Sequence, residues 1–124
     1  MTYQWDNKKP TAQMLGRWQP FHEGHYKLFK EIIKKTGQVC IQIRDVQGVD
    51  DNPFDFETVK KNIEDKLNPE FEGRFKIIVV PNITNICYGR GVGYKIEEIV
   101  LDEETQKISA TKIRAKMREE GKLK

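Results

Sequence analysis

Apolar positions along this chain repeat first at strand spacing and then at helical spacing, and the change predicts its first elements. Residues 11–15 form a short apolar strand, and the apolar side chains that follow recur every three or four positions. That spacing predicts a helix that begins near Gly24 and is capped by Gly37. A second buried strand is expected over 39–43, ending at Arg44.

The middle of the chain predicts another helix and another strand. A polar, glycine-containing loop over 45–53 leads to a helix over 54–67, which Asn68 and Pro69 are expected to close. Residues 75–80 are almost all apolar, which is typical of a strand covered on both faces of a parallel sheet.

The last third is less regular. Residues 83–88 and 94–101 are predicted as further strands or extended segments on either side of a glycine-rich turn at 89–93. A final helix is expected after residues 109–111. Strands and helices alternating in this way predict right-handed crossovers and a Rossmann-like three-layer α/β sandwich with a mainly parallel sheet.

Ligands of such sheets bind outside the carboxyl ends of the strands. The turn before Gly24, Arg44 with its following loop, and the turn at 89–93 are all expected at that edge. The sequence therefore predicts one ligand site there.

Composition is that of a single globular domain. The 124 residues carry a net charge of +3, with 33% charged and 37% hydrophobic residues. We expect a tail over 1–10 that docks onto one domain over 11–124. No stretch suits a signal peptide or a membrane helix, so we expect a cytoplasmic protein without a membrane partner and with Cys40 and Cys87 as buried thiols. The modest charge disfavours nucleic acid as a partner, and a homo-oligomer is compatible with the sequence.

The most informative segment is Gly16-Arg17-Trp18-Gln19-Pro20-Phe21-His22-Glu23-Gly24-His25. It lies where a strand passes into a helix, and a helix start offers unpaired N–H groups and a partial positive charge to an anion. Two imidazoles can add directed donors. Metal binding is disfavoured, because the chain has no third histidine and no HExxH motif.

This segment resembles the signature of the HxGH nucleotidylyltransferase superfamily, and its extended form is closest to archaeal-type nicotinamide-mononucleotide adenylyltransferases, which usually have Phe where Trp18 stands. Ile108-Ser109-Ala110-Thr111-Lys112-Ile113-Arg114 resembles the second superfamily signature. Asp51-Asn52-Pro53-Phe54 is similar to a Glu-Asn-Pro-Phe stretch of the same enzymes, although a plain helix entry also explains it.

The resemblance implies transfer of AMP from ATP to a small anionic acceptor, such as nicotinamide mononucleotide, with release of pyrophosphate. It implies that His22 and His25 contact oxygens around the α-phosphorus and that Arg114 holds the leaving pyrophosphate. The phosphate- and nucleotide-binding residues would be Gly16, Arg17, Trp18, Phe21, Gly24, Ser109, Ala110 and Thr111. Arg44 and Asn52 would contact the acceptor. Magnesium is expected as a cofactor carried mainly by the phosphates, with no protein ligand.

Several alternatives stay open. Arg17 and Arg44 are explained equally well as phosphate contacts and as surface charges. Ser109 and Thr111 are also good helix N-caps. Cytidylyl transfer is compatible with the same motifs. Because the chain lacks the Gly-x-Asp that many relatives have, and is short between Val80 and Ile108, a nucleotide-binding regulatory module without turnover is a further alternative.

Overall fold

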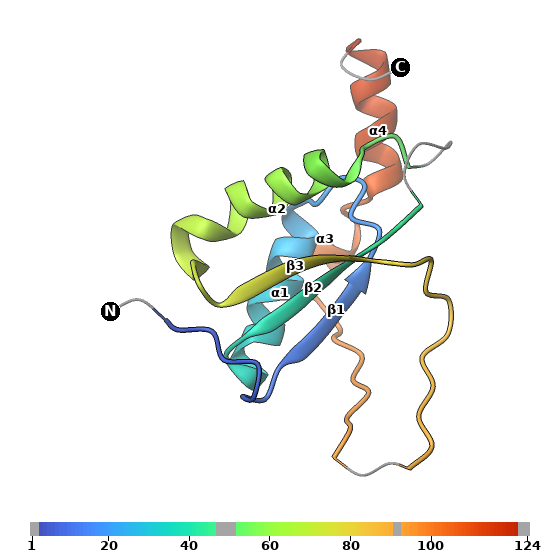
Figure 1. Ribbon diagram of the computed structural model, residues 1–124. Helices are drawn as coiled ribbons and strands as arrows, with labels where there is room; N and C mark the ends of the chain where they lie inside the picture. The colour runs from blue at the N-terminus through green and yellow to red at the C-terminus, as the bar shows by residue number, and fades with distance from the viewer. Residues whose placement is uncertain (1–2, 47–51, 91–92, 122–124) are drawn as a thin grey trace.

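Three parallel strands form the sheet in the order β1, β2, β3 (Figure 1). The computed structural model describes residues 3–46, 52–90 and 93–121. Along the chain the elements are β1 (Ala12–Gly16), α1 (Glu23–Thr36), β2 (Val39–Arg44), α2 (Phe56–Phe71), β3 (Phe75–Val80), α3 (Glu103–Gln106) and α4 (Ala110–Glu119). The predicted α/β architecture with a parallel sheet is confirmed.

The core lies between the sheet and helices α1 and α2. The strand register aligns Met14, Ile41 and Ile77 in one row across the sheet. Phe29 of α1 packs edge-on against Phe71 of α2, with ring centroids 5.1 Å apart, so both helices cover the same face. The buried apolar residues are Met14, Trp18, Phe21, Phe29, Ile32, Ile33, Val39, Ile41, Ile43, Val59, Ile63 and Leu67.

Strand β3 is more exposed than its apolar sequence predicts. Ile78 is 41% exposed and Val79 is 50% exposed. The expectation of a strand covered on both faces is wrong, because β3 is an edge strand in the described sheet and both α1 and α2 supply the same helical layer. Apolar content alone does not distinguish a central strand from an edge strand.

Helix α2 is displaced from its predicted range of 54–67. It starts later because Asp55 is the N-cap, accepting a 2.8 Å hydrogen bond from the Thr58 N–H. It continues past the predicted end with Pro69 inside its last turn. The extra turn brings Phe71 into contact with the aromatic rings of α1, and that packing offsets the hydrogen bond that proline cannot make.

The segment between β3 and α3 departs from the sheet (Figure 1). The described parts of 83–88 and 94–101 contain no strand, so the extended alternative holds and the strand alternative is wrong. Large apolar side chains on this segment are exposed, among them Ile86, Tyr94 and Val100. Cys87 is exposed and Cys40 is half-buried, so neither cysteine is the buried thiol expected.

The N-terminal segment contacts residues that lie just before β2 and β3. The Tyr3 hydroxyl donates a 3.0 Å hydrogen bond to Gln38 Oε1, and the Arg74 guanidinium lies 4.5 Å from the Tyr3 ring centroid. Gln38 is fully buried and donates to the Asp6 carbonyl and to Thr11 Oγ1. In the described residues, no helix has the length and apolar character needed to cross a membrane.

Candidate functional site

Trp18 shapes the turn that leaves β1. It has a left-handed φ of 54°, which is uncommon for a residue with a side chain. Its indole N–H donates a 3.1 Å hydrogen bond to the Gln42 carbonyl, and its ring lies over Gly16. A Cβ at Gly16 would come within 2.7 Å of that ring, so glycine at this position makes room for the indole.

Helix α1 begins with two histidines that cap each other. His22 is the N-cap, and its Nδ1 accepts hydrogen bonds from the N–H groups of Gly24 (3.0 Å) and His25 (3.4 Å). In return, His25 Nδ1 accepts a 3.1 Å hydrogen bond from the His22 N–H. This reciprocal arrangement is a capping box built from imidazoles. A Cβ at Gly24 would lie 2.8 Å from His22 Cε1, so glycine leaves space for the capping ring.

Both imidazoles are held in the neutral form. Burial, and then the positive charge of His22, lower the pKa of His25 from 6.5 to about 3. Burial, and then the charge of Lys66, also lower the pKa of His22. Because each Nδ1 accepts a hydrogen bond, the proton of each neutral ring lies on Nε2. The pair therefore supplies two uncharged N–H donors at the helix start.

The start of α4 faces the same turn. Ser109 is its N-cap, and its hydroxyl accepts a 3.4 Å hydrogen bond from the Lys112 N–H. Arg114, which is 2% exposed, donates from Nη1 to the Gln19 carbonyl and from Nη2 to Thr111 Oγ1, at 3.3 Å. The two signature motifs, far apart in sequence, are thus in direct contact.

A hollow of about 180 Å³ lies between the two helix starts. Its lining residues are Leu15, Gly16, Arg17, Trp18, Gln19, His25, Ala110 and Arg114. Two guanidinium groups border it, and α1 and α4 begin beside it, so its electrostatic character favours an anion. Most of the residues singled out in the sequence therefore gather at one place.

His22 and Phe21 support this hollow without lining it. The His22 ring stacks on the His25 ring, and the Phe21 ring centroid lies 5.4 Å from that of His25. Phe21 is only 4% exposed, and its ring also packs edge-on against Trp18. The aromatic packing holds the orientation of His25.

The residues predicted to bind an acceptor lie outside the hollow. Arg44, at the end of β2, donates a 2.7 Å hydrogen bond to Asn82 Oδ1. Asn52 is nearly buried, and its Oδ1 lies 3.4 Å from Arg17 Nη1, so it borders an exposed arginine that does line the hollow. Asp51, which belongs to the same sequence resemblance, lies outside the described residues.

The described residues of the glycine-rich turn do not line this hollow. Gly89 is exposed and is not among the lining residues. The expectation that this turn lies at the ligand edge is therefore wrong, because the segment pairs with no described strand that would carry it there. Residues 91 and 92 of the turn lie outside the described residues.

Gln19 is a site residue that the sequence prediction missed. It is 2% exposed, and its side-chain amide donates one hydrogen bond to the Phe54 carbonyl and accepts another from the Phe54 N–H. Glutamine in a polar turn usually lies on the surface, and its spacing relative to the histidines gives no hint of burial.

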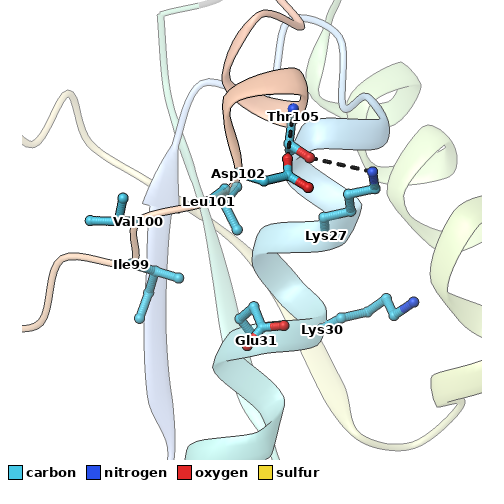
Figure 2. Close-up of a pocket in the computed structure, with 8 residues that line it drawn as sticks. All are labelled: Lys27, Lys30, Glu31, Ile99, Val100, Leu101, Asp102 and Thr105. Carbon is cyan, nitrogen blue, oxygen red and sulfur yellow. Dashed lines mark hydrogen bonds between the residues drawn. The ribbon is translucent and has the colours of Figure 1, made fainter.

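A larger hollow of about 350 Å³ lies beside α1, where Lys27 donates a hydrogen bond to Thr105 (Figure 2).

That larger hollow is a weaker candidate for the site. It is bordered by Lys27 and Lys30 but also by Glu31 and Asp102, so its charges offset each other. The Asp102 carboxylate caps the short helix α3 by accepting from the Thr105 N–H at 2.8 Å. Neither α1 nor α4 begins there. The geometry favours the smaller hollow as the anion site.

The donor set of that smaller hollow does not suit a metal ion bound by the protein. Within the described residues, no three His, Cys, Asp or Glu side chains gather as metal ligands. The charged side chains that line it are arginines.

Comparison with known proteins gives partial similarity. The chain is 44% identical over 45 residues to a nicotinamide-nucleotide adenylyltransferase of Methanococcus aeolicus, covering 35% of this chain and 26% of that protein. Proteins of the same name from two strains of Methanococcus maripaludis are 44% identical over 36 residues, which is 29% of this chain and 21% of theirs. No protein-family model matches. The chain thus spans about a quarter of the length of these curated relatives, and over that part its resemblance to archaeal nicotinamide-nucleotide adenylyltransferases is confirmed.

Proposed function

We propose that this protein is a nucleotidylyltransferase that transfers AMP from ATP to a small phosphorylated acceptor and releases pyrophosphate. The observation that carries the proposal is the convergence of two helix starts, the His25 imidazole with His22 stacked on it, and two arginines at one hollow. The similarity to nicotinamide-nucleotide adenylyltransferases makes nicotinamide mononucleotide, or a close analogue, the first acceptor to test.

In the proposed reaction, an oxygen of the acceptor phosphate attacks the α-phosphorus of ATP. A new P–O bond forms there while the bond to the bridging oxygen of the β-phosphate breaks, and pyrophosphate leaves with that oxygen. The step needs no covalent enzyme intermediate. The protein contributes alignment of two anions and stabilisation of charge in the in-line transition state.

The capping histidines would serve the α-phosphate. The pKa of His25 is about 3, so its Nε2–H stays a neutral donor at neutral pH while charge develops on the phosphoryl oxygens. The lowered pKa of His22 favours the same neutral form. Gly24 has no Cβ that would push the His22 ring out of its capping position. The Nδ1 bonds to the backbone hold both rings in one orientation, which limits reorganisation during the reaction.

The start of α4 would hold the β- and γ-phosphates. Ser109, Ala110 and Thr111 form the start of that helix, whose first N–H groups are available to an anion, and Arg114 lines the hollow beside them. Arg114 would thus stabilise the negative charge that accumulates on the departing pyrophosphate. Arg17, exposed at the mouth, would attract the incoming anion.

The volume of the hollow limits which part of a nucleotide can fit inside it. Small-molecule pockets usually measure about 300 to 1,000 Å³, and this one is about 180 Å³. That volume suits phosphate groups better than a whole nucleotide. The nucleoside and the acceptor would therefore extend beyond it, with Arg44 and the Asn52–Arg17 pair as proposed acceptor contacts. Magnesium would arrive bound to the ATP phosphates.

The test is pyrophosphate release from magnesium with ATP or CTP, using a panel of phosphorylated acceptors that includes nicotinamide mononucleotide. We expect turnover with ATP, and a loss of roughly 100- to 1,000-fold in His25→Ala. His22→Asn is the sharper variant, because asparagine retains a good helix N-cap but lacks the Nε2 donor. Loss of turnover with unchanged thermal stability would assign the donor role to His22.

A nucleotide-binding module without turnover is the second candidate, favoured by the short match to full-length enzymes and by the three-stranded sheet. It predicts saturable MgATP binding with no histidine-dependent pyrophosphate release for any acceptor. Preferential use of CTP would instead establish cytidylyl transfer. Failure of the intact, folded protein to bind either nucleotide would overturn both candidates.

A further inference from the structure

We propose that Gln19 is a positioning residue that fixes the two anion-binding helix starts relative to each other. The inference rests on the proposed function, because it concerns how the same site is assembled. Its basis is a set of hydrogen bonds, which we call the Gln19 clasp, formed by Gln19, the main chain of Phe54 and the Arg114 guanidinium.

The side chain of Gln19 acts like a piece of neighbouring backbone. Its Nε2 donates to the Phe54 carbonyl and its Oε1 accepts from the Phe54 N–H, both at 2.8 Å. Only a group that carries both a donor and an acceptor in fixed geometry satisfies both partners. This pair attaches the turn after β1 to the segment that leads into α2.

The main chain of Gln19 makes the third connection. Its carbonyl accepts from Arg114 Nη1, across 95 positions of sequence. Both residues are 2% exposed, so the bond is shielded from water and a charged donor strengthens it. Gln19 therefore joins three segments that no strand pairing connects directly: the turn before α1, the approach to α2, and α4.

The location of the clasp explains why it would matter for binding. Gln19 lies three positions before the N-cap His22, and Arg114 is one turn into α4. Gln19 forms hydrogen bonds with Phe54 and Arg114, so it would act on a phosphate through the groups that it holds in place. A shift of about 1 Å between binding groups is enough to cost large factors in alignment.

Two variants and one control test the clasp. Gln19→Leu removes both side-chain hydrogen bonds at similar volume. Gln19→Glu keeps the acceptor for the Phe54 N–H but, when ionised, sets an oxygen against the Phe54 carbonyl. Gln4→Glu makes the same chemical change on the exposed N-terminal segment. All are made in a Trp5→Phe background, so that Trp18, which packs edge-on against His25 at 4.7 Å, is the fluorescent reporter.

Two quantities are measured: hydrogen exchange at the Phe54 amide and the dissociation constant for MgATP. In Gln19→Leu we expect exchange to accelerate and the dissociation constant to rise about tenfold, equivalent to about 1.4 kcal/mol. Gln19→Glu keeps the acceptor for the Phe54 N–H, so exchange should change less there, but the dissociation constant should rise similarly at pH 7.5 and recover, relative to the parent protein at the same pH, at pH 5.5. Burial favours the protonated carboxyl, which can donate to the Phe54 carbonyl.

The two measurements separate the inference from the proposed function. If the parent protein does not bind MgATP, the proposed function fails, and the clasp fails with it as a positioning device. If the parent binds MgATP but Gln19→Leu binds it equally well while Phe54 exchange accelerates, the hydrogen bonds are merely structural and the inference is overturned. Unchanged exchange in both Gln19 variants overturns it as well.

Discussion

The imidazole rings of His22 and His25 stack face to face, with their centroids 3.6 Å apart and their planes 15° from parallel. Two cationic rings at this separation would repel each other strongly, and charging either one would also remove an Nδ1 acceptor from the capping box. The ring stacking and the capping hydrogen bonds therefore both favour neutral imidazoles. A pair of neutral donors follows from local helix geometry, before any ligand is considered.

Acid should therefore weaken the fold through His25. Its pKa is about 3 in the folded protein and about 6.5 when unfolded, so the unfolded chain binds more protons between those values. The free energy of unfolding should fall as pH is lowered from 6.5 towards 3, by up to about 1.4 kcal/mol per pH unit. His25→Gln should flatten this dependence, because glutamine suits the same capping-box position and does not titrate.

Urea unfolding at pH 7.5, 6.0 and 5.0 gives the comparison. Both proteins contain the same carboxylates, so the difference between their slopes isolates the histidine. Identical slopes would mean that His25 is not held neutral by its surroundings.

Gly24 should tolerate no side chain without loss of binding. Alanine is a better helix former than glycine by about 1 kcal/mol, but its Cβ would lie 2.8 Å from Cε1 and 3.1 Å from Nδ1 of His22. The ring must move, so we expect Gly24→Ala to weaken MgATP binding at least tenfold while the fold persists. Gly89→Ala, where no atom lies within 4 Å, is the control. Isothermal titration decides, and equal affinities would contradict the assigned role of Gly24.

Local sequence predicted the helix starts around the hollow better than it predicted how the strands are covered. The starts of α1 and α4 follow from short-range signals, namely a capping residue and a following periodic stretch, and the end of α1 follows from Gly37, which has a φ of 82°. Such signals depend on neighbouring residues in the chain. The two motifs could therefore be located, although their contact through Arg114 could not.

The missed features depend on partners far away in the chain. Ile78 and Tyr94 belong to stretches that are apolar enough for strands, yet whether they are covered depends on what packs beside them. Gln19 is buried because the Phe54 backbone and Arg114 happen to satisfy its polar groups. Hydrophobic periodicity carries no information about such long-range hydrogen bonds.

A negative charge at the start of α4 should weaken phosphate binding while leaving the stability of the helix almost unchanged. Ser109→Asp keeps an excellent N-cap and places a carboxylate where the helix dipole favours it, so thermal stability should stay within about 0.5 kcal/mol. The same carboxylate would repel the phosphates, and MgATP should bind at least about tenfold more weakly. Gln106→Glu, an equal charge change at an exposed position of α3, serves as the control. Equal weakening of MgATP binding in both variants would mean that the effect comes from the net charge of the protein and not from the position of the new carboxylate.

Gly16 and Trp18 should be coupled energetically. Gly16→Ala should destabilise the protein by about 1 to 3 kcal/mol, because the new Cβ would lie 2.7 Å from Cζ2 and 2.8 Å from Cε2 of the indole. Trp18→Phe removes those atoms and the hydrogen bond to the Gln42 carbonyl, at a similar cost. In the double variant the alanine meets a smaller ring, so Gly16→Ala should cost at least about 1 kcal/mol less there than in the parent. Urea unfolding of the four proteins measures this coupling. Additive effects, within about 0.5 kcal/mol, would mean that the glycine is required by the backbone of the turn and not by the indole that lies over it.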